Sequence, residues 1–533
     1  MENNKQRRSS EIDWFSMIVP LVGVIAVCLW IFISPRQSEI IIQTVRSFFS
    51  DDIGIIYAIV GLGMFICTMY VAFSKYGKIK LGKESDKPIY SSFSWGVMIF
   101  TATMAADTLF YSLCEWALYA NEPYIDSLGG IQKWASTYPL FHWGPIGWSF
   151  YIMVGAAFGF MLHVRGREKQ KFSEGCRPLI GDKVDGIWGK IINVIAIFAL
   201  IAGTATSFSV STPLLTRALT KVFGFKQGTG LTMCVLIVIA LVYTLTVLFG
   251  MKGIQKLASY CSYLFFALLL YVLIGGHEAT YILETGFSAL GNMTQNFIGM
   301  ATNLDPLREN MFPQNWTIYY WAYWLTCCAA TPFFIGKISK GRTIKNTILG
   351  GYAWGLAGTF VSFIILGNYG MAQQLKHGVD ISGTIAKTGD YSAAILKIFD
   401  TLPLSSIGLI MLVITMITFY STTLDALTMV ISSYSYKKLK ADKEPHKAVR
   451  TFWAVVFVLF PIALIFAENS MYSLQSVSVI SAFPMGVVVI MVIVSFFKDA
   501  NKFLKGNKSD KTGNIAIAAN SNTSDNEALT EEQ

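Results

Sequence analysis

Apolar runs of about 20 residues recur along most of the chain, and their length limits what it can fold into. An α-helix of that length spans about 30 Å, the thickness of the hydrocarbon layer of a membrane. Charged residues make up only 14% of the 533 residues and hydrophobic residues 53%, whereas a soluble domain carries about 25% charged residues. The runs therefore predict an all-α polytopic membrane protein embedded in a lipid bilayer.

The sequence predicts about twelve transmembrane helices. They cover residues 14–33, 54–73, 93–119, 143–162, 187–208, 231–250, 257–275, 316–335, 347–366, 404–433, 451–467 and 474–497. Residues 93–275 and 316–497 hold equal numbers of runs that begin on opposite sides of the membrane, which is typical of the five-plus-five inverted repeat of many secondary transporters. The remaining segments are two extra helices in 14–92, an outer amphipathic connection in 276–315, and cytoplasmic tails at 1–13 and 498–533.

Lysine and arginine gather in the loops on one side of the predicted membrane. The basic segments are 5–8, 75–87, 165–171, 252–256, 337–345, 437–450 and 498–508. Cytoplasmic loops carry such an excess, so we predict a multi-pass plasma-membrane protein with both termini in the cytoplasm. The net charge of +9 arises in these loops and does not indicate a nucleic-acid partner. One outer connection departs from the pattern, because residues 209–230 carry Arg217, Lys221 and Lys226.

Motifs for enzyme chemistry or for a bound cofactor are missing from the sequence. The eight cysteines show no CxxC or Cys/His spacing, which argues against a metal site and a disulfide framework. No ATP-binding P-loop occurs either. We therefore expect a protein that is not an enzyme, has no cofactor, and draws its energy from a gradient, with Na⁺ or H⁺ as the coupling ion.

Residues 315–324, with the sequence NWTIYYWAYW, hold six aromatic rings within nine residues. The face of an aromatic ring attracts cations, and a cage of rings suits a quaternary ammonium group, which has a charge but no N–H to donate. The alternative is an interfacial belt, since Trp and Tyr also collect where hydrocarbon meets lipid head groups. The density of rings and the apolar run that continues to residue 335 favour the cage.

This segment resembles the signature of the betaine/carnitine/choline transporter family. Two further segments resemble the same family: ISKGRTI at 338–344, and FHWGP at 141–145 followed by Trp148 and Tyr151. The similarity in order and spacing extends from about residue 14 to residue 500. The resemblance implies a LeuT-type fold with two extra N-terminal helices, and a homotrimer.

The resemblance also implies which residues bind the substrate. An aromatic cage between the fourth and eighth helices would consist of Trp143, Trp148, Tyr151, Trp321, Tyr323 and Trp324. Trp316 lies nearer the outer end and is a candidate for a second, peripheral site. The chain departs from the family pattern where Tyr323 replaces a Trp and Cys327 replaces an aromatic residue.

Asp107 lies in the third predicted helix, where an unpaired carboxylate is costly and usually functional. In the resembling family, an acidic residue at this position accompanies choline-type substrates, and glycine accompanies betaine. Two alternatives stay open: Asp107 pairs with a buried lysine or caps a helix end, or it is protonated and couples transport to H⁺. The same helix supplies Met104 beside the substrate, with alanines where the family has an unwound glycine-rich stretch.

A candidate sodium site follows from the resemblance, with ligands from the third and tenth helices. These are Thr101, Met104, Phe419, Thr422 and Thr423. Hydroxyls beside unwound carbonyls would suit Na⁺, but Ser and Thr in membrane helices also commonly bond back to their own helix. Cys261 stands where cation-independent exchangers of the family have an arginine, so the sequence favours an external ion.

Two other carboxylates lie in predicted membrane helices. We expect structural or gating roles for Glu115, two turns after Asp107, and for Asp425, which would pair with a loop lysine. His142 would bond to a backbone carbonyl.

The sequence thus predicts a secondary transporter of quaternary ammonium compounds, with a choline-like cation favoured and ion-coupled uptake. Glycine betaine, carnitine or γ-butyrobetaine, taken up or exchanged, remain alternatives. An osmosensor or receptor that binds without transport is an alternative of another class.

Overall fold

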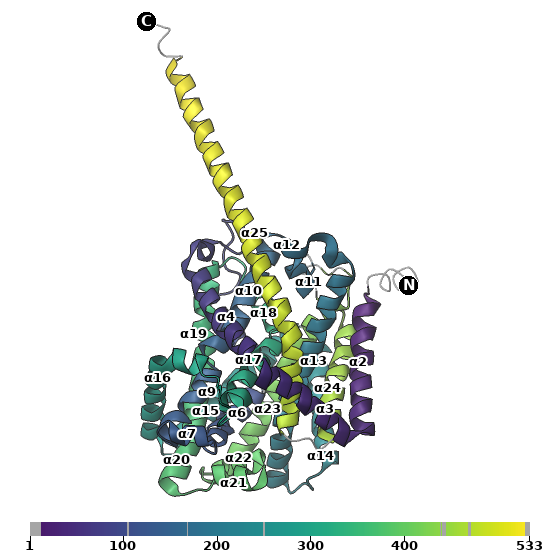
Figure 1. Cartoon of the computed structure of the whole chain (residues 1–533), viewed down its shortest axis with the longest axis vertical. Helices are drawn as coiled ribbons and strands as arrows, with labels where there is room; N and C mark the ends of the chain where they lie inside the picture. The colour runs from purple at the N-terminus through teal and green to yellow at the C-terminus, as the bar shows by residue number, and fades with distance from the viewer. Residues whose placement is uncertain are drawn as a thin grey trace.

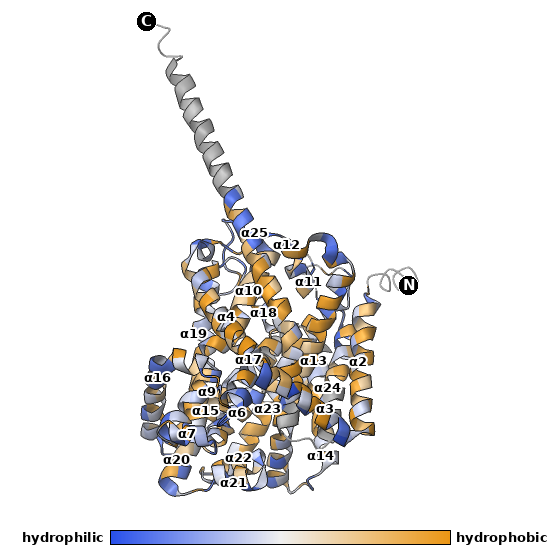
Figure 2. Ribbon diagram, in the orientation of Figure 1, coloured by the Kyte–Doolittle hydropathy of each residue, from blue (hydrophilic) through white to orange (hydrophobic). Residues whose placement is uncertain are grey.

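The structure is a computed structural model that describes residues 12–103, 106–167, 169–248, 251–437, 439, 444–466 and 471–527. These residues form helices throughout, and they contain only two isolated β-bridges, Ile12–Tyr436 and Lys80–Thr343. The all-α prediction is therefore confirmed for the part of the chain that the structure describes. Hydrophobic residues dominate the long helices in Figure 2, and hydrophilic residues gather at the two ends of the helix bundle.

Seven helical stretches are each long and apolar enough to cross a membrane, or eight if one bent pair is counted as a span, within the described residues. The seven stretches are Trp14–Ile33, Ile55–Phe73, Ile131–Val164, Ile187–Phe223, Ile344–His377, Ser405–Tyr434 and Gln475–Gly506. The other predicted spans are shorter, bent or interrupted. The count of about twelve spans and the repeat therefore remain predictions.

The first helices follow the sequence closely. Helix α2 has the predicted bounds, Trp14–Ile33, and Asp13 caps it by accepting from the backbone N–H of Ser16 at 3.3 Å. A Ser-Pro step then starts α3 (Pro35–Ser47), which the hydropathy pattern did not predict because its residues are polar on one face. A short π-helical turn leads from α3 into α4 (Ile55–Phe73).

Two of the predicted spans lie at breaks between helices. The third predicted span holds α5 (Ser92–Thr103) and α6 (Ala106–Tyr119), and residues 104–105 between them lie outside the described part of the structure. The fourth, predicted over 143–162, follows α9 (Thr137–His142) after a break at Trp143 and Gly144 and forms α10 (Pro145–Gly159). The eighth, predicted as one helix over 316–335, is split into α17 (Ile318–Cys327) and α18 (Thr331–Ile338). Pro332 explains this split, since it lacks the N–H that would continue α17.

The remaining helices complete the bundle around these interrupted spans. They are α13 (Ile187–Phe223), α14 (Thr229–Leu248), α15 (Met251–Gly275), α16 (Ala279–Thr302), α19 (Ile344–Ser362), α20 (Asn368–His377), α23 (Ser405–Tyr434), α24 (Lys447–Phe466) and α25 (Met471–Glu527). Helices α10 and α18 approach very closely, because a Cβ on Gly336 would lie 2.7 Å from the backbone nitrogen of Gly159.

The two ends of the bundle carry different short elements. Helices α21 (Ser382–Thr388) and α22 (Tyr391–Asp400) lie at the lower end in Figure 1, and α11 (Phe172–Gly175) and α12 (Arg177–Ile180) lie at the upper end. The lower end corresponds to the predicted outer side. There α15 and α16 meet at an angle of 112°, so the amphipathic helix expected in 276–315 turns away from the direction of α15.

Ion pairs account for the basic outer connection that departs from the charge pattern. Arg217 pairs with Asp390 and Lys221 with Asp400, near the two ends of α22. Both partners belong to the outer connection after α20. The basic charges in 209–230 are thus matched by acidic residues on the same side.

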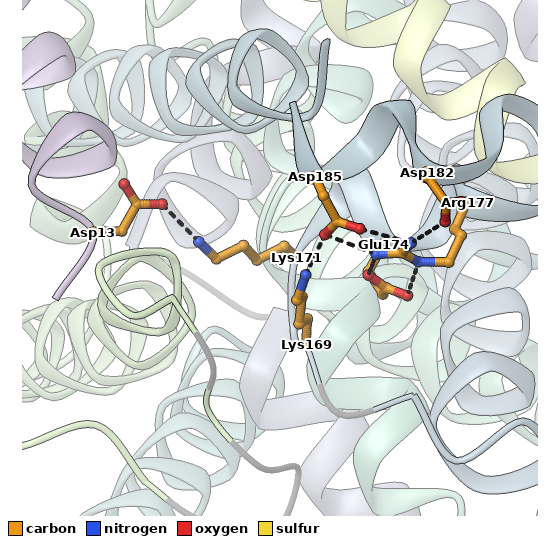
Figure 3. Close-up of polar contacts among 7 residues, drawn as sticks. All are labelled: Asp13, Lys169, Lys171, Glu174, Arg177, Asp182 and Asp185. Carbon is orange, nitrogen blue, oxygen red and sulfur yellow. Dashed lines mark hydrogen bonds and ion pairs between the residues drawn. The ribbon is translucent and has the colours of Figure 1, made fainter. Parts of the chain in front are cut away.

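A network of charged residues lies at the opposite end of the bundle (Figure 3). Lys171 bonds to Asp13 at 3.0 Å, while Arg177 contacts Glu174 at 2.6 Å and Asp185 at 2.9 Å. Burial opposes ionisation of Asp13, but the nearby Lys171 ammonium and the hydrogen bonds to the carboxylate hold its pKa below the ordinary value. The network therefore ties the start of α2 to the segment before α13.

Candidate substrate site

A cavity of about 70 Å³ lies between α6, α10, α13, α17, α18 and α23. Its lining consists of Asp107, Thr108, Trp143, Tyr151, Leu200, Gly203, Thr204, Ser207, Tyr323, Trp324, Cys327, Thr331, Thr423 and Leu427. A single water needs about 10–15 Å³ of such space, so the cavity has room for a group larger than one water. Residues of the third, fourth and eighth predicted spans all contribute to it.

Four aromatic side chains line this cavity, and we call them the cavity rings: Trp143, Tyr151, Tyr323 and Trp324. Trp324 is central among them, with its ring centroid 4.8 Å from that of Tyr151 and 5.7 Å from that of Trp143. Trp143 and Tyr323 are 6.5 Å apart. Aromatic rings thus surround a small space, and a ring that turns its face toward this space would attract a cation.

The other two residues of the predicted cage lie behind the cavity rings. Trp148 packs against Trp324, with the ring centroids 5.7 Å apart. Trp321 faces away from the cavity and packs against Phe141, at 5.4 Å. Neither residue is in the cavity lining. Tyr323 follows Trp321 by two residues, so these two side chains point to different faces of α17.

Hydrogen bonds and one glycine fix the two cavity tryptophans. The indole N–H of Trp324 donates to the backbone carbonyl of His142 at 3.0 Å, and that of Trp143 donates to Glu115 at 2.8 Å. The Trp324 indole lies directly on α10, since a Cβ on Gly147 would be 2.4 Å from its Nε1 atom. The break at Gly144 places Trp143 before the start of α10. Trp143 therefore lines the cavity from a bend, whereas the sequence predicted a continuous helix from this residue onward.

Asp107 is the acidic group of the cavity, and its side chain is only 3% exposed. The hydroxyl of Tyr323 donates to Oδ2, while Oδ1 accepts no hydrogen bond of good geometry from the described residues, although the Ser207 hydroxyl and the backbone N–H of Thr108 lie near the carboxylate. The ion pairs among the described residues do not include Asp107. The structure therefore shows the neutral hydroxyl of Tyr323 beside Asp107. It does not show the pairing with a buried lysine that was one alternative for this residue.

The candidate sodium ligands are only partly brought to the cavity. Thr423 lines it, whereas the hydroxyl of Thr422 donates to the carbonyl of Phe419 at 3.0 Å, as hydroxyls in membrane helices commonly do. Helix α23 runs unbroken through these residues, so the unwound carbonyls expected there are not seen. Met104 and the side chain of Thr101 lie outside the described part of the structure.

Helix α13 supplies four cavity residues that the sequence did not point to: Leu200, Gly203, Thr204 and Ser207. Thr204 and Ser207 stand three residues apart and so share one face of α13. The same helix carries Thr206, Ser209, Ser211 and Thr212, so the sequence alone did not distinguish the cavity hydroxyls from the others. Thr331 at the start of α18 was missed as well, because the predicted eighth span ran through it unbroken.

Three further predicted residues lie away from the cavity rings. Trp316 is partly buried, donates to Glu122 at 2.7 Å and packs against Tyr119. Asp425 pairs with Arg450 of α24, and not with a loop lysine. The His142 ring contacts two hydroxyls, of Tyr119 at 2.7 Å and of Thr317 at 3.0 Å, in place of the expected carbonyl.

Long apolar helices around a buried cavity of aromatic rings define an integral membrane protein that handles a small solute. The chain belongs to the BCCT, betaine/carnitine/choline family of transporters, whose family model matches residues 15–504. The resemblance seen in the sequence is thereby confirmed, and the protein is a transporter and not an enzyme.

Relatives with curated names support this assignment. A probable glycine betaine transporter of Desulfitobacterium hafniense is 28% identical over 93% of this chain and 99% of its own length. A carnitine transporter of Acinetobacter baumannii is 26% identical over 80% of this chain and 78% of its own. A solved Na⁺-coupled sialic acid symporter aligns with 84% of this chain and 86% of its own, at a TM-score of 0.44 and 14% identity.

Proposed function

We propose that this protein takes up a quaternary ammonium compound across the plasma membrane, with a choline-like cation preferred and with Na⁺ or H⁺ as the coupling ion. The observation that carries the proposal is the buried Asp107 carboxylate among the cavity rings. Its Oδ1 atom accepts no hydrogen bond of good geometry from the described residues. A buried carboxylate needs a compensating charge or donor, and a cationic substrate would supply it.

The cavity rings would hold the trimethylammonium group, which offers no N–H for hydrogen bonding. Such a group is recognised by ring faces and by charge. Asp107 would supply the negative charge, while Thr204, Ser207 and Thr423 would offer hydroxyls to the polar end of the substrate. A zwitterion such as betaine would bring its own carboxylate close to Asp107, and the repulsion would weaken its binding.

A zwitterionic substrate is the second candidate, and two observations favour it. Tyr323 already donates to Asp107, which lowers the need of the carboxylate for a cation. The relatives described above are named for glycine betaine and carnitine. If a zwitterion is the substrate, Asp107 would be protonated when it binds.

A competition experiment in proteoliposomes distinguishes the two. Unlabelled choline, glycine betaine, carnitine and γ-butyrobetaine compete against labelled choline and labelled betaine, with and without Na⁺ and at two pH values. We expect choline to compete best and Na⁺ to lower its half-maximal concentration. If betaine or carnitine competes in this experiment and choline does not, the proposal that choline is the preferred substrate is overturned.

For the bound ion, Thr423 and Thr422 provide the oxygen ligands that a hard cation such as Na⁺ prefers. Thr423 faces the cavity, and the oxygen of Thr422 keeps free lone pairs while its proton is donated to Phe419. Sodium would neutralise part of the charge that Asp107 brings to the cavity.

A further inference from the structure

A second buried carboxylate, Glu115, lies directly behind the cavity rings. It is on the same face of α6 as Asp107, eight residues further along, and its side chain is fully buried. Its Oε2 atom accepts from the indole N–H of Trp143 at 2.8 Å and from the hydroxyl of Tyr320 at 2.6 Å. Its Oε1 atom accepts from the hydroxyl of Tyr119 at 2.7 Å. Glu115 itself does not line the cavity.

The donors around Glu115 describe an ionised carboxylate. Three different groups donate to its two oxygens, and a carboxylate accepts such bonds without offering a proton of its own. The single proton of Tyr119 is given to Glu115, so Nδ1 of His142 must donate to the Tyr119 oxygen, 2.7 Å away. His142 Nδ1 lies 3.9 Å from Glu115 Oε1. The ring of His142 is thereby fixed, and its backbone carbonyl holds Trp324.

Trp143 is the residue through which the charge of Glu115 affects the cavity. Its indole stands between Glu115, which binds its N–H, and the cavity that its ring lines. A hydrogen bond to a carboxylate polarises the donor, and groups inside a protein feel such polarisation strongly because the dielectric constant is low. More electron density on the ring strengthens its attraction for a cation. The added electron density does not strengthen the attraction of the ring for an uncharged group of the same shape.

We propose that Glu115 is a specificity-determining positioning residue: it orients Trp143 and places a negative charge behind it, so that the cavity selects a cation over an uncharged isostere. This inference rests on the proposed function, because it assumes a quaternary ammonium substrate. Glu115 acts only through Trp143 and does not touch the substrate. Its effect is therefore on discrimination by charge, in addition to any effect on packing.

The test compares choline with 3,3-dimethylbutan-1-ol, in which carbon replaces the charged nitrogen. Each compound competes against labelled choline in proteoliposomes that hold the wild type or Glu115→Gln. The amide retains the size of the carboxylate and one acceptor but removes the charge. We expect the inhibition constant of choline to rise about tenfold in the variant, since a charge in a low-dielectric site acts over this range. That of the alcohol should stay within about twofold of the wild type, because it has no charge to lose.

Glu278→Gln is the matched control. Glu278 is a buried carboxylate at the start of α16 that bonds Lys376 at 2.5 Å and His377 at 2.7 Å, and it does not line the cavity. Glu278→Gln should leave the ratio of the inhibition constant of the alcohol to that of choline as in the wild type. An unchanged ratio in Glu115→Gln, or an equal rise of both constants, would overturn the inference. Failure of choline to compete in the wild type would overturn the proposed function instead.

A second variant decides the matter if Glu115→Gln does not fold. Trp143→Phe keeps a ring beside the cavity but has no N–H for Glu115. We expect the ratio of the inhibition constant of the alcohol to that of choline to fall in this variant also. Full retention of the ratio in Trp143→Phe would contradict the inference.

Discussion

Trp324 lines the cavity and packs against the rings of Trp143, Trp148 and Tyr151. If its face contacts the ammonium group, Trp324→Leu should weaken choline binding by about 1–2 kcal/mol, or about tenfold. Inhibition of labelled choline uptake by unlabelled choline measures this. Trp188→Leu, at an exposed position near the start of α13, is the control for loss of a tryptophan. Equal affinities in both variants and the wild type would remove Trp324 from the site.

In the proposed function, Asp107 favours a substrate that carries a positive charge. At an effective dielectric constant of about 20, two unit charges about 5 Å apart interact by roughly 3 kcal/mol, which is about a hundredfold in affinity. Asp107→Gly should therefore weaken choline transport and improve that of betaine or carnitine. Uptake of each labelled compound by wild type and variant gives the preference ratio. If this ratio does not move, the carboxylate is already neutral in the wild type.

Tyr323 shows what a sequence can and cannot reveal about single residues. Two residues of the aromatic run, Tyr323 and Trp324, line the cavity, and so do Trp143 and Tyr151 of the predicted cage. The run could not show that Tyr323 donates to Asp107, because the two residues are far apart in the chain and meet only when α6 and α17 pack together. The same applies to Glu115 and Trp143.

At the scale of elements, α23 carries the candidate ion ligands. Replacing Thr422 and Thr423 together by Ala should abolish any Na⁺ stimulation of uptake, because both hydroxyl oxygens are lost. Thr415→Ala is the control, since the Thr415 hydroxyl bonds to Met411 of the same helix and does not line the cavity. Uptake measured at a series of Na⁺ concentrations tests this. Persistent stimulation in the double variant would place the ion elsewhere.

The start of α2 depends on the pair of Asp13 and Lys171. Asp13→Asn removes the charge that compensates Lys171, whose side chain is 7% exposed. We expect a loss of about 1–3 kcal/mol of stability, seen as a lower melting temperature in detergent. The pKa of Asp13 is lowered in the folded protein, so its contribution is present at neutral pH and disappears as the pH falls through that pKa. The difference between variant and wild type should therefore begin to shrink only below about pH 4, the ordinary pKa of the group, and should vanish once the pH is below the lowered pKa. A difference that persists there would exclude the ion pair as its cause.

Helix ends were predictable where the hydropathy changes sharply. The predicted and observed bounds of α2 agree, Trp14–Ile33, because Asp13 precedes the apolar run and Pro35 follows it. The break between α17 and α18 was not predicted, since residues 316–335 are apolar throughout and only Pro332 marks it. The interruptions that form the cavity are thus the part of the fold that hydropathy reveals least.

At the scale of the whole molecule, the charge pattern predicts that both termini lie in the cytoplasm. The ion pairs of Arg217 and Lys221 explain the one outer connection that departs from this pattern. A count of basic residues does not register an acidic partner that lies about 170 residues further along the chain. The homotrimer remains a prediction. Light scattering of the purified protein should give three times the chain mass of 59.1 kDa. A single chain mass would contradict it.

Uptake of labelled choline into sealed proteoliposomes tests the central claim most directly. We predict saturable accumulation inside the vesicles, absent from vesicles without protein, inhibited more strongly by unlabelled choline than by betaine, and reduced in Asp107→Gly. Saturable binding with no label inside would show a receptor and not a transporter. Accumulation of betaine or carnitine, with choline neither transported nor inhibitory, would contradict the assignment of a cationic substrate to Asp107.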